Sequence, residues 1–296
     1  MIKSIKQDEF ASTLMSSVKA AYSFYYDDSI TDSMLFGLTG HAFVTHITNG
    51  LGPCAPYIWD GQPFNELCKA NLGLNIFGEN EVVTSDSSAE KKMEVTRNIM
   101  NHLDSANLVL LSSYEYQLIV DYDDTFFITT KPWKEVESVT QNFELNSFKG
   151  MKEFMTCFMI SRTNRIDLKE GIKRSLKYAI SLYENSKDNT DSGFGIEAYD
   201  FWLEKITEEN ANAHGNWWTS TVWAESRKMA SKYMIELKSY FDSDMVLEEL
   251  SVLYDKSYTL FTKIADRDLD MKDKIELIKL LKRNELAIFE LLKKLI

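Results

Sequence analysis

Two histidines and a cysteine lie close together near the beginning of the chain. His41, His46 and Cys54 fall within fourteen residues, and Gly37 and Gly40 directly precede them. Histidine is the commonest general base of enzymes, and a deprotonated thiol is a nucleophile for acyl transfer. The segment could therefore carry an acid–base pair, His41 with His46, or a base and a nucleophile, His46 with Cys54. The alternative is structural, because histidines in glycine-rich loops often donate hydrogen bonds and free cysteines are often buried.

Aromatic side chains form a second concentration of candidate residues, much farther along the chain. Within 29 residues the sequence holds Tyr199, Trp202, Trp217, Trp218 and Trp223, together with His214, Asn216 and Arg227. Such a concentration lines a ligand pocket in some proteins and fills a core between domains in others. If it lines a pocket, we expect the glycine-rich segment to form another wall. The predicted ligand-binding residues are then His41, Phe43, His46, Trp59, Tyr116, Tyr199, Trp202, Asn216, Trp217, Trp223 and Arg227.

Metal and phosphate sites are not indicated. Asp121, Asp123 and Asp124 form an acidic cluster of the kind that binds hard cations, but the calcium-loop pattern is absent. Between two predicted strands, aspartates more often shape the turn through local hydrogen bonds. The cysteines at positions 54, 68 and 157 are too scattered for a zinc site or a disulfide framework, and no phosphate-binding or dinucleotide-binding motif occurs. The sequence therefore predicts no cofactor and no metal.

The charge balance restricts the partners. The chain of 296 residues has 33 Lys and Arg against 45 Asp and Glu, a net charge of −12. Nucleic acids and anionic membranes attract basic surfaces, so neither is an expected partner. The N-terminal residues lack the apolar core of a signal peptide, and no stretch reaches the roughly eighteen apolar residues that a membrane-spanning helix requires. We therefore expect a cytoplasmic protein with reduced thiols.

Proline and hydrophobic periodicity predict the elements that would position these residues. All four prolines lie in the first 132 residues, so the rest of the chain is expected to be helical. Apolar residues at helical spacing predict helices over residues 8–26, capped by Asp8, and over 64–72, 87–105, 167–185, 195–209, 216–241, 245–264 and 271–296. β-Branched and aromatic residues predict strands over 107–121, 125–130 and 154–161, with a helix as the alternative for the last. The expected class is α+β.

Two short stretches resemble a known family. Residues 34–43 (MLFGLTGHAF) and 115–124 (EYQLIVDYDD) resemble the N-terminal domain of butirosin biosynthesis protein H and its bacterial relatives. Residues 198–202 (AYDFW) and 223–227 (WAESR) resemble the helical part of such two-part proteins. The resemblance implies a papain-like, cysteine-peptidase-like α+β domain over residues 1–165. An all-α helical domain over residues 166–296 is expected to cap its cleft.

The resemblance also implies acyl transfer or amide cleavage through a Cys-His-Asp or Cys-His-Asn triad. The family's cysteine begins the first helix, where this chain has Ser12, Ser16 and Ser17 but no cysteine. The histidine position falls on Glu115, or on Tyr116 if the register shifts by one residue. The acidic position falls near Thr130 or Lys131, before Pro132. The family's triad is thus altered or lost, and a serine facing a glutamate is a poor nucleophile–base pair unless burial raises the pKa of the carboxyl group.

Three functional hypotheses follow. The first is a protein that binds a small molecule in the interdomain cleft and descends from acyltransferases or amidohydrolases. The second is an active acyltransferase or amide hydrolase that uses Cys54 or a serine of the first helix, with His41 and Glu115 as further catalytic candidates. The third is a non-catalytic scaffold protein. The expected partners are a small-molecule ligand, with an acyl thioester or an acyl carrier protein as candidates, and a second copy of the chain in a homodimer.

Overall fold

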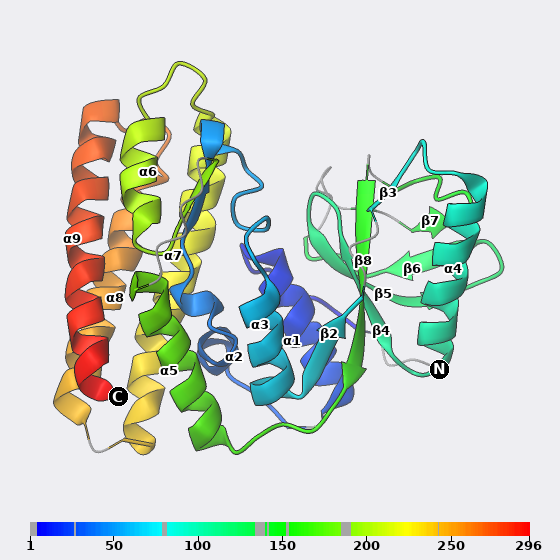
Figure 1. The fold of residues 1–296 in the computed structure, drawn as a ribbon, viewed down its shortest axis with the longest axis horizontal. Coiled ribbons are helices and arrows are strands. Elements are labelled where there is room, and N and C mark those ends of the chain that lie inside the picture. Colours follow the sequence, from blue (N-terminus) through cyan, green and yellow to red (C-terminus); the bar gives the residue numbers. More distant parts are fainter. Residues whose placement is uncertain are drawn as a thin grey trace. The chain divides into compact units, whose positions relative to one another are not determined.

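The structure, a computed structural model, describes residues 5–26, 28–78, 82–133, 140, 142–151, 154–184, 191–241 and 243–296. The chain divides into two compact units (Figure 1). The first unit comprises residues 1–29 and 68–165, and the second comprises residues 30–67 and 166–296. The class is α+β, as predicted, because an antiparallel sheet occupies the first unit and the C-terminal region is helical.

A sheet of seven strands dominates the described part of the first unit. Its strands are β2 (Leu74–Phe77), β3 (Val82–Thr84), β4 (Leu108–Ser112), β5 (Tyr116–Tyr122), β6 (Phe126–Thr129), β7 (Phe143–Glu144) and β8 (Phe154–Arg162). Their order is β2-β8-β4-β5-β6-β7, and every pairing is antiparallel. The long strand β8 pairs with β4 along one side and with β2 and then β3 along the other. The strand alternative for residues 154–161 is therefore confirmed.

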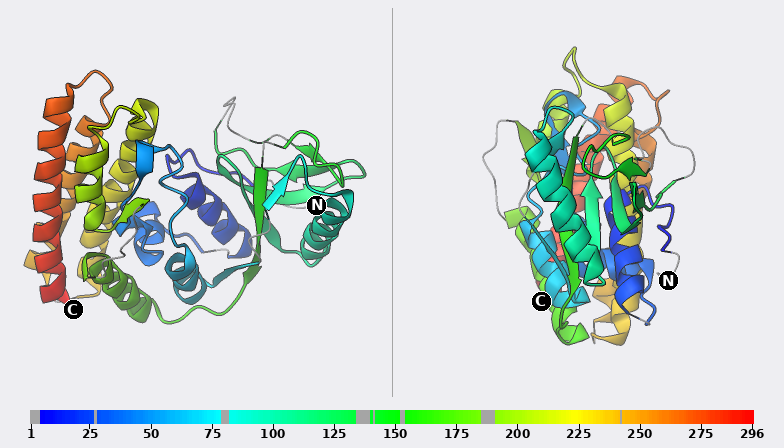
Figure 2. Two further views of the ribbon diagram at one scale, coloured as in Figure 1. Left: turned by 45° about the horizontal axis from the view of Figure 1, so that its top comes forward. Right: turned by 90° about the vertical axis from the view of Figure 1, so that its right-hand side faces the viewer.

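Two helices cover the two faces of this sheet, as Figure 2 shows. The helix α4 (Ala89–Asp104) follows its cap, Ser88, whose side chain accepts a hydrogen bond from the N–H of Lys91 at 3.2 Å. Its apolar side packs on the sheet in a core that includes Val95, Ile99, Leu103, Val109, Leu111, Ile119, Phe127 and Phe143. The helix α1 (Thr13–Tyr25) packs on the opposite face, against β5. The helix predicted over residues 87–105 is thus confirmed.

Two local predictions in the first unit were wrong. The first helix begins at Thr13 and not at Asp8, because Ser12 is extended and its side chain accepts the N–H of Met15 as the helix cap. The single strand predicted over residues 107–121 is two strands, β4 and β5, which pair with Leu110 opposite Leu118. The apolar run is long enough for both strands, and the polar residues at 113–115 form the turn between them.

The second unit is mainly helical. Its helices are α2 (Asp32–Leu38), α3 (Gln62–Leu67), α5 (Leu168–Glu184), α6 (Glu197–Lys205), α7 (Ala213–Glu236), α8 (Asp244–Ile264) and α9 (Met271–Leu295). Figure 1 shows α7, α8 and α9 side by side, and a short antiparallel pair joins β1 (His46–Thr48) to β9 (Ser192–Phe194). The helices predicted after residue 166 are confirmed. Residues 186–195, rich in Asp, Asn, Thr, Ser and Gly, are typical of a linker between the two flanking helices. The described part of this stretch contains β9, while residues 185–190 lie outside the described residues.

Residues 30–67 lie in the second unit, which differs from the predicted division at residue 165. The predicted glycine loop begins as α2, and Gly40 then takes a φ of +74° before the short helix His41–Phe43. A Cβ on Gly37 would lie 2.4 Å from the ring of Tyr233 in α7, so only glycine permits this approach of α2 to α7. The segment therefore packs among helices that occur far later in the chain. Within the described residues, every helix is too short or too polar to cross a membrane.

Candidate functional site

The first residue of α1 and the turn between β4 and β5 meet inside the first unit. The family resemblance implies the base at Glu115, in this turn, and the nucleophile at the beginning of the first helix, the region that contains Thr13. The hydroxyl of Thr13 donates a hydrogen bond to Oε2 of Glu115 at 2.8 Å, and the N–H of Tyr116 donates to Oγ1 of Thr13 at 3.0 Å. Thr13 is 0% exposed and Glu115 is 7% exposed. The two positions are thus in contact, but they hold a hydroxyl and a carboxylate.

Gln7 links this pair to the neighbouring strands. Its side-chain amide donates to Oγ of Ser17 at 2.8 Å and to the backbone carbonyl of Tyr116 at 3.2 Å. Its side-chain oxygen accepts a hydrogen bond from the hydroxyl of Thr130, which in turn accepts the N–H of Leu118 at 2.9 Å. Thr130 occupies the position where the resemblance places the acidic residue of the triad. There it joins Gln7 to the backbone of β5.

The serines predicted as alternative nucleophiles take part in the beginning of α1. Ser12 caps the helix, and Ser17 accepts a hydrogen bond from Gln7. The hydroxyl of Ser16 donates to the backbone carbonyl of Asp8 at 2.6 Å. These bonds satisfy polar groups that a buried helix start would otherwise leave exposed to an apolar environment.

The chemistry open to the Thr13–Glu115 pair is limited. A general base works best when its pKa lies near the operating pH, and an ordinary carboxylate is far too weak a base to remove the proton of a threonine hydroxyl. The Thr13 oxygen also accepts the N–H of Tyr116, so the hydroxyl is held as both donor and acceptor. Such an arrangement stabilises the junction of α1 with β5.

His41, in the second unit, is completely buried among aromatic rings. Its ring lies 5.5 Å from the ring of Phe36 and 5.8 Å from that of Trp223, and Nδ1 lies 3.2 Å from Oγ of Ser226. Burial, with a smaller contribution from the charge of Arg227, lowers the pKa of His41 to about 3. The imidazole is therefore neutral at physiological pH, and its environment is that of a core residue.

His46 and Cys54 differ in their exposure. Nδ1 of His46 lies 2.7 Å from the backbone carbonyl of Ala55, and burial lowers the pKa of this histidine. Because a carbonyl accepts hydrogen bonds, Nδ1 carries the proton. Cys54 is exposed, whereas Cys157 is buried and burial raises the pKa of its thiol to about 12. Among the three thiols, Cys54 is therefore the accessible one.

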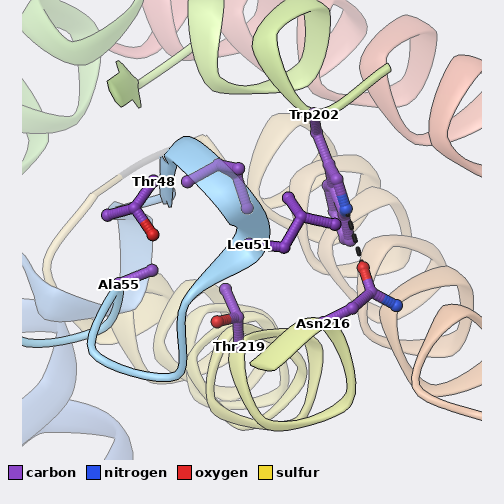
Figure 3. Close-up of a pocket in the computed structure, with 7 residues that line it drawn as sticks. Thr48, Leu51, Ala55, Trp202, Asn216 and Thr219 are labelled. Atoms are coloured by element: carbon purple, nitrogen blue, oxygen red, sulfur yellow. Dashed lines mark hydrogen bonds between the residues drawn. The ribbon is translucent and has the colours of Figure 1, made fainter. Parts of the chain in front are cut away.

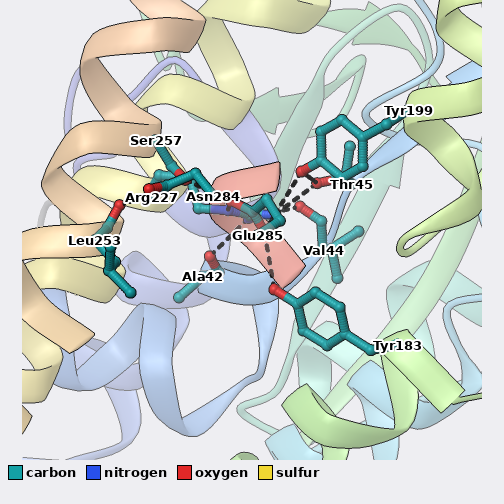
Figure 4. A network of polar contacts seen from close by, with 10 residues as sticks. All are labelled: Ala42, Val44, Thr45, Tyr183, Tyr199, Arg227, Leu253, Ser257, Asn284 and Glu285. Atoms are coloured by element: carbon teal, nitrogen blue, oxygen red, sulfur yellow. Dashed lines mark hydrogen bonds and ion pairs between the residues drawn. The ribbon is translucent and has the colours of Figure 1, made fainter. Parts of the chain in front are cut away.

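Arg227 forms the centre of a buried polar network in the second unit, shown in Figure 4. Its guanidinium donates to both carboxylate oxygens of Glu285, at 2.9 and 3.0 Å, and both side chains are 1% exposed. The remaining donors reach the carbonyls of Ala42 and Val44 at 3.0 Å and Oγ1 of Thr45 at 2.6 Å. All five guanidinium N–H groups therefore have protein partners. The network ties the His41 segment to α7 and α9.

The other aromatic candidates of the second unit also have partners within it. The ring N–H of Trp202 donates to Asn216 at 2.8 Å, and that of Trp223 donates to the carbonyl of His46 at 3.1 Å. The hydroxyl of Tyr199 lies 3.0 Å from Oγ1 of Thr45. All three aromatic side chains are at most 1% exposed. They fill the core of the unit.

The remaining candidates lie nearer the surface of their units or pack between rings. Phe43 packs against the rings of Tyr233 and Tyr254. The ring N–H of Trp59 donates to the carbonyl of Pro56 at 2.8 Å. Trp217 is half-buried under the guanidinium of Arg267, which lies 4.2 Å from its ring centre. Tyr116, in the first unit, is hydrogen-bonded to Ser112, and burial raises its pKa.

A small pocket lies beside Trp202, and Figure 3 shows its lining. It is bounded by Ile47, Thr48, Leu51, Ala55, Trp202, Asn216 and Thr219 and contains about 150 Å³ of empty space, open solvent included. Pockets for drug-sized ligands contain roughly 300–1,000 Å³. This pocket is therefore too small for such a ligand, although Oγ1 of Thr219 is buried in it without a hydrogen-bond partner.

Metal coordination finds no support in the described residues, which contain no group of three or more His, Cys, Asp or Glu side chains placed to hold an ion. The acidic cluster shapes a turn, as predicted. Oδ1 of Asp123 accepts the N–H groups of Thr125 and Phe126, each at 2.7 Å. These bonds lower the pKa of Asp123.

Thr13 and Gln7 are the site residues that the sequence did not reveal. The search for a replacement nucleophile considered serines, whereas the hydroxyl that contacts Glu115 belongs to the threonine beside Ser12. Comparison with models of protein families finds no match for this chain, and comparison with curated proteins finds none either. The resemblance to the butirosin biosynthesis protein H family therefore stays a prediction.

Proposed function

We propose that this protein is a non-catalytic, cytoplasmic binding protein of papain-like, acyl-transferring ancestry. The observation that supports this proposal is the hydrogen bond of Thr13 to Glu115, at the positions where the resemblance expects a cysteine and a histidine. In this proposal the family's nucleophile–base pair has become a structural bond that joins α1 to β5. The fold is kept because it binds a ligand and not because it transforms one.

The residues around the Thr13 hydroxyl favour binding over catalysis. A nucleophilic hydroxyl needs a base that accepts its proton, and that base needs a partner that orients it. Here the third position, Thr130, donates its hydroxyl to Gln7, and Gln7 donates to Ser17 of α1, so the residue at the place of the family's acidic group is engaged in joining α1 to β5. In the second unit, His41 is neutral and buried, and it offers no accessible alternative.

The ligand class in this proposal comes from the ancestry. Acyl-transferring enzymes bind acyl thioesters, either free or carried on an acyl carrier protein. A descendant that has lost the reaction is expected to keep the binding of this substrate class. Because the acidic overall charge disfavours anionic groups, we expect the acyl and amide parts of the ligand to make the closest contacts.

Calorimetric titration with a hydrolysis-resistant thioether analogue of acetyl-coenzyme A, and with longer acyl chains of the same type, tests the binding. The proposal predicts saturable binding that requires the acyl group, so that coenzyme A alone binds more weakly. Heat changes that are equal with and without the acyl chain would contradict an acyl-specific site.

A scaffold protein without a small ligand is the second candidate. It is favoured by the closed core of the second unit, where Trp202, Trp223 and Arg227 are satisfied by their own neighbours. The pocket beside Trp202 is too small for an organic ligand. The absence of binding to every thioether in the titration would favour this candidate.

A further inference from the structure

One cluster of side chains in the first unit gathers all three places where the chain passes between the units. The passages lie between residues 29 and 30, 67 and 68, and 165 and 166. Tyr26 and Asp28 lie just before the first passage, and Thr163 and Arg165 lie just before the third. The second passage falls inside the helical stretch formed by α3 (Gln62–Leu67) and the turn Cys68–Leu72, and Gly73 follows the end of that stretch. The first unit contains all of Tyr26, Asp28, Gly73, Thr163 and Arg165. Segments that are far apart in sequence thus meet at one point.

Hydrogen bonds join the three segments directly. The hydroxyl of Tyr26 lies 2.9 Å from the carbonyl of Thr163 and 3.1 Å from that of Gly73, and it is shared as a donor between them. The N–H of Thr163 donates to the carbonyl of Gly73 at 2.8 Å. Arg165 donates to Oδ2 of Asp28 at 2.8 Å. Each segment is therefore bonded to another within the same unit.

Packing adds a geometric restriction to these bonds. The guanidinium groups of Arg162 and Arg165 lie 4.6 and 4.8 Å from the ring centre of Tyr26. Gly73 has a φ of +70°, and a Cβ there would lie 2.1 Å from the hydroxyl of Tyr26 and 2.7 Å from the carbonyl of Thr163. Only glycine fits this position, so the close approach of the three segments is built into the sequence.

We propose that this cluster, Tyr26, Asp28, Gly73, Thr163 and Arg165, is a clasp that makes the three passages act as one hinge between the units. Hinges consist of a few residues at the ends of elements, and two units joined by one chain are expected to move unless something restricts them. While the clasp is closed, the three passages leave the first unit from one fixed point and the units move about a single joint. When it opens, each passage can move independently.

Pulsed electron–electron double resonance tests the proposal, because it measures the distribution of distances between a spin label in one unit and a spin label in the other. The labels are placed on the exposed residues Asp124, in the first unit, and Asp255, in the second, as Asp124→Cys and Asp255→Cys. Cys54→Ser removes the exposed native thiol, while Cys68 and Cys157 are buried. This triply substituted protein is the reference.

Opening the clasp should broaden the distribution of distances between the two labels. Tyr26→Phe with Arg165→Gln removes the shared hydroxyl and the ion pair, and we expect added distances that the reference lacks. The matched control, Arg174→Gln, removes an exposed arginine that pairs with Glu170 in α5, and it should leave the distribution unchanged. Asp28→Asn removes the exposed ion pair with Arg165 and perturbs the hydrogen bond that Asp28 accepts from Tyr22, so it should keep the fold and broaden the distribution less.

Two results would overturn the clasp. One is a reference distribution already as broad as that of the Tyr26→Phe, Arg165→Gln protein. The other is an unchanged distribution in both the double variant and Asp28→Asn while circular dichroism shows the secondary structure intact. If the double variant loses its secondary structure, the Asp28→Asn protein decides the result alone.

Discussion

The guanidinium of Arg227 has five N–H donors, and all five are used inside the second unit. Glu285 is equally buried and accepts further hydrogen bonds from Ser257 and from Tyr183. Removing one member of such a pair leaves the other as an uncompensated buried charge, which costs much more than the net value of the pair. At the scale of single residues, Arg227 therefore has a structural role, which is to join the His41 segment to α7 and α9.

Arg227→Met should lower the free energy of unfolding by about 3–5 kcal/mol, because it strands the carboxylate of Glu285. Urea denaturation measures this change. The matched control is Arg174→Met, whose partner Glu170 is half-exposed, and such a pair contributes about 0–1 kcal/mol. Equal losses in the two variants would contradict the structural role of the buried pair.

The lowered pKa of His41 should make the free energy of unfolding depend on pH. Its pKa is lowered to about 3 in the folded protein, whereas an unfolded histidine titrates near about 6.5. Between these values the unfolded state binds the additional proton, so stability that is present above about pH 6.5 is lost as the pH falls toward about 3. From about pH 7.5 to about pH 5, this one residue should remove about 2 kcal/mol.

The comparison of His41→Gln with the wild type checks that dependence. We expect the free energy of unfolding to fall less steeply with decreasing pH in His41→Gln than in the wild type. His214→Gln serves as the control because that side chain is exposed. A slope that is the same in the wild type and in His41→Gln would mean that the imidazole is not held neutral by burial.

At the scale of elements, the beginning of α1 carries the candidate site. The hydroxyl of Thr13 bridges the carboxylate of Glu115 and the N–H of Tyr116, and therefore helps fix α1 to the start of β5. Thr13→Val keeps the shape but leaves two buried polar groups without this partner. We expect a loss of about 1–3 kcal/mol in the free energy of unfolding.

The control for Thr13→Val is Thr262→Val, an exposed threonine in α8 whose hydroxyl donates only to the backbone carbonyl of Tyr258. Chemical denaturation of both variants gives the difference. If Thr13→Val is no less stable than Thr262→Val, then the hydroxyl does not hold the two elements together.

The elements also show how far the sequence can be interpreted. Regular hydrophobic spacing identified the long helices, because α8 and α9 each bury one side against their neighbours. It did not separate β4 from β5, since aromatic and apolar residues lie on both sides of the short polar stretch at 113–115, and such a pattern fits one long strand or a tight pair. It also placed the start of α1 at Asp8, because the choice between Asp8 and Ser12 depends on backbone angles that spacing does not reveal.

The candidate site was predictable only in part. The resemblance led to Glu115, but the contact with Thr13 depends on how α1 packs on β5, over a separation of 102 residues. Arg227 and the tryptophans were predicted as ligand contacts. Aromatic residues and arginine occur in both pockets and cores, and the sequence alone does not distinguish the two. Burial distinguishes the two environments, and burial is a property of the folded chain.

At the scale of the whole molecule, the second unit is completed by residues 30–67. Phe36 and Phe43 of this segment are at most 2% exposed, and Tyr233, from α7, packs against Phe43 and touches Gly37. A fragment of residues 1–165 would retain this apolar segment without the helices of its unit. We therefore expect that fragment to aggregate or to show poorly dispersed amide signals in nuclear magnetic resonance spectra.

A fragment in which a glycine–serine linker replaces residues 30–67, joining residues 1–29 to 68–165, is the matched comparison. It contains every segment of the first unit and should give well-dispersed amide signals. The reverse outcome, a folded 1–165 fragment and an unfolded linker fragment, would show that residues 30–67 belong to the first unit.

The most direct test of the non-catalytic assignment is the intact mass of the protein after incubation with a panel of acyl thioesters. The wild type, Thr13→Val and Cys54→Ser are compared, because Cys54 is an exposed thiol that thioesters can acylate without catalysis. We predict no adduct other than a slow one that Cys54→Ser abolishes and urea-unfolded protein also forms. A rapid adduct that persists in Cys54→Ser and disappears in Thr13→Val would contradict the account, because it would make Thr13 a working nucleophile.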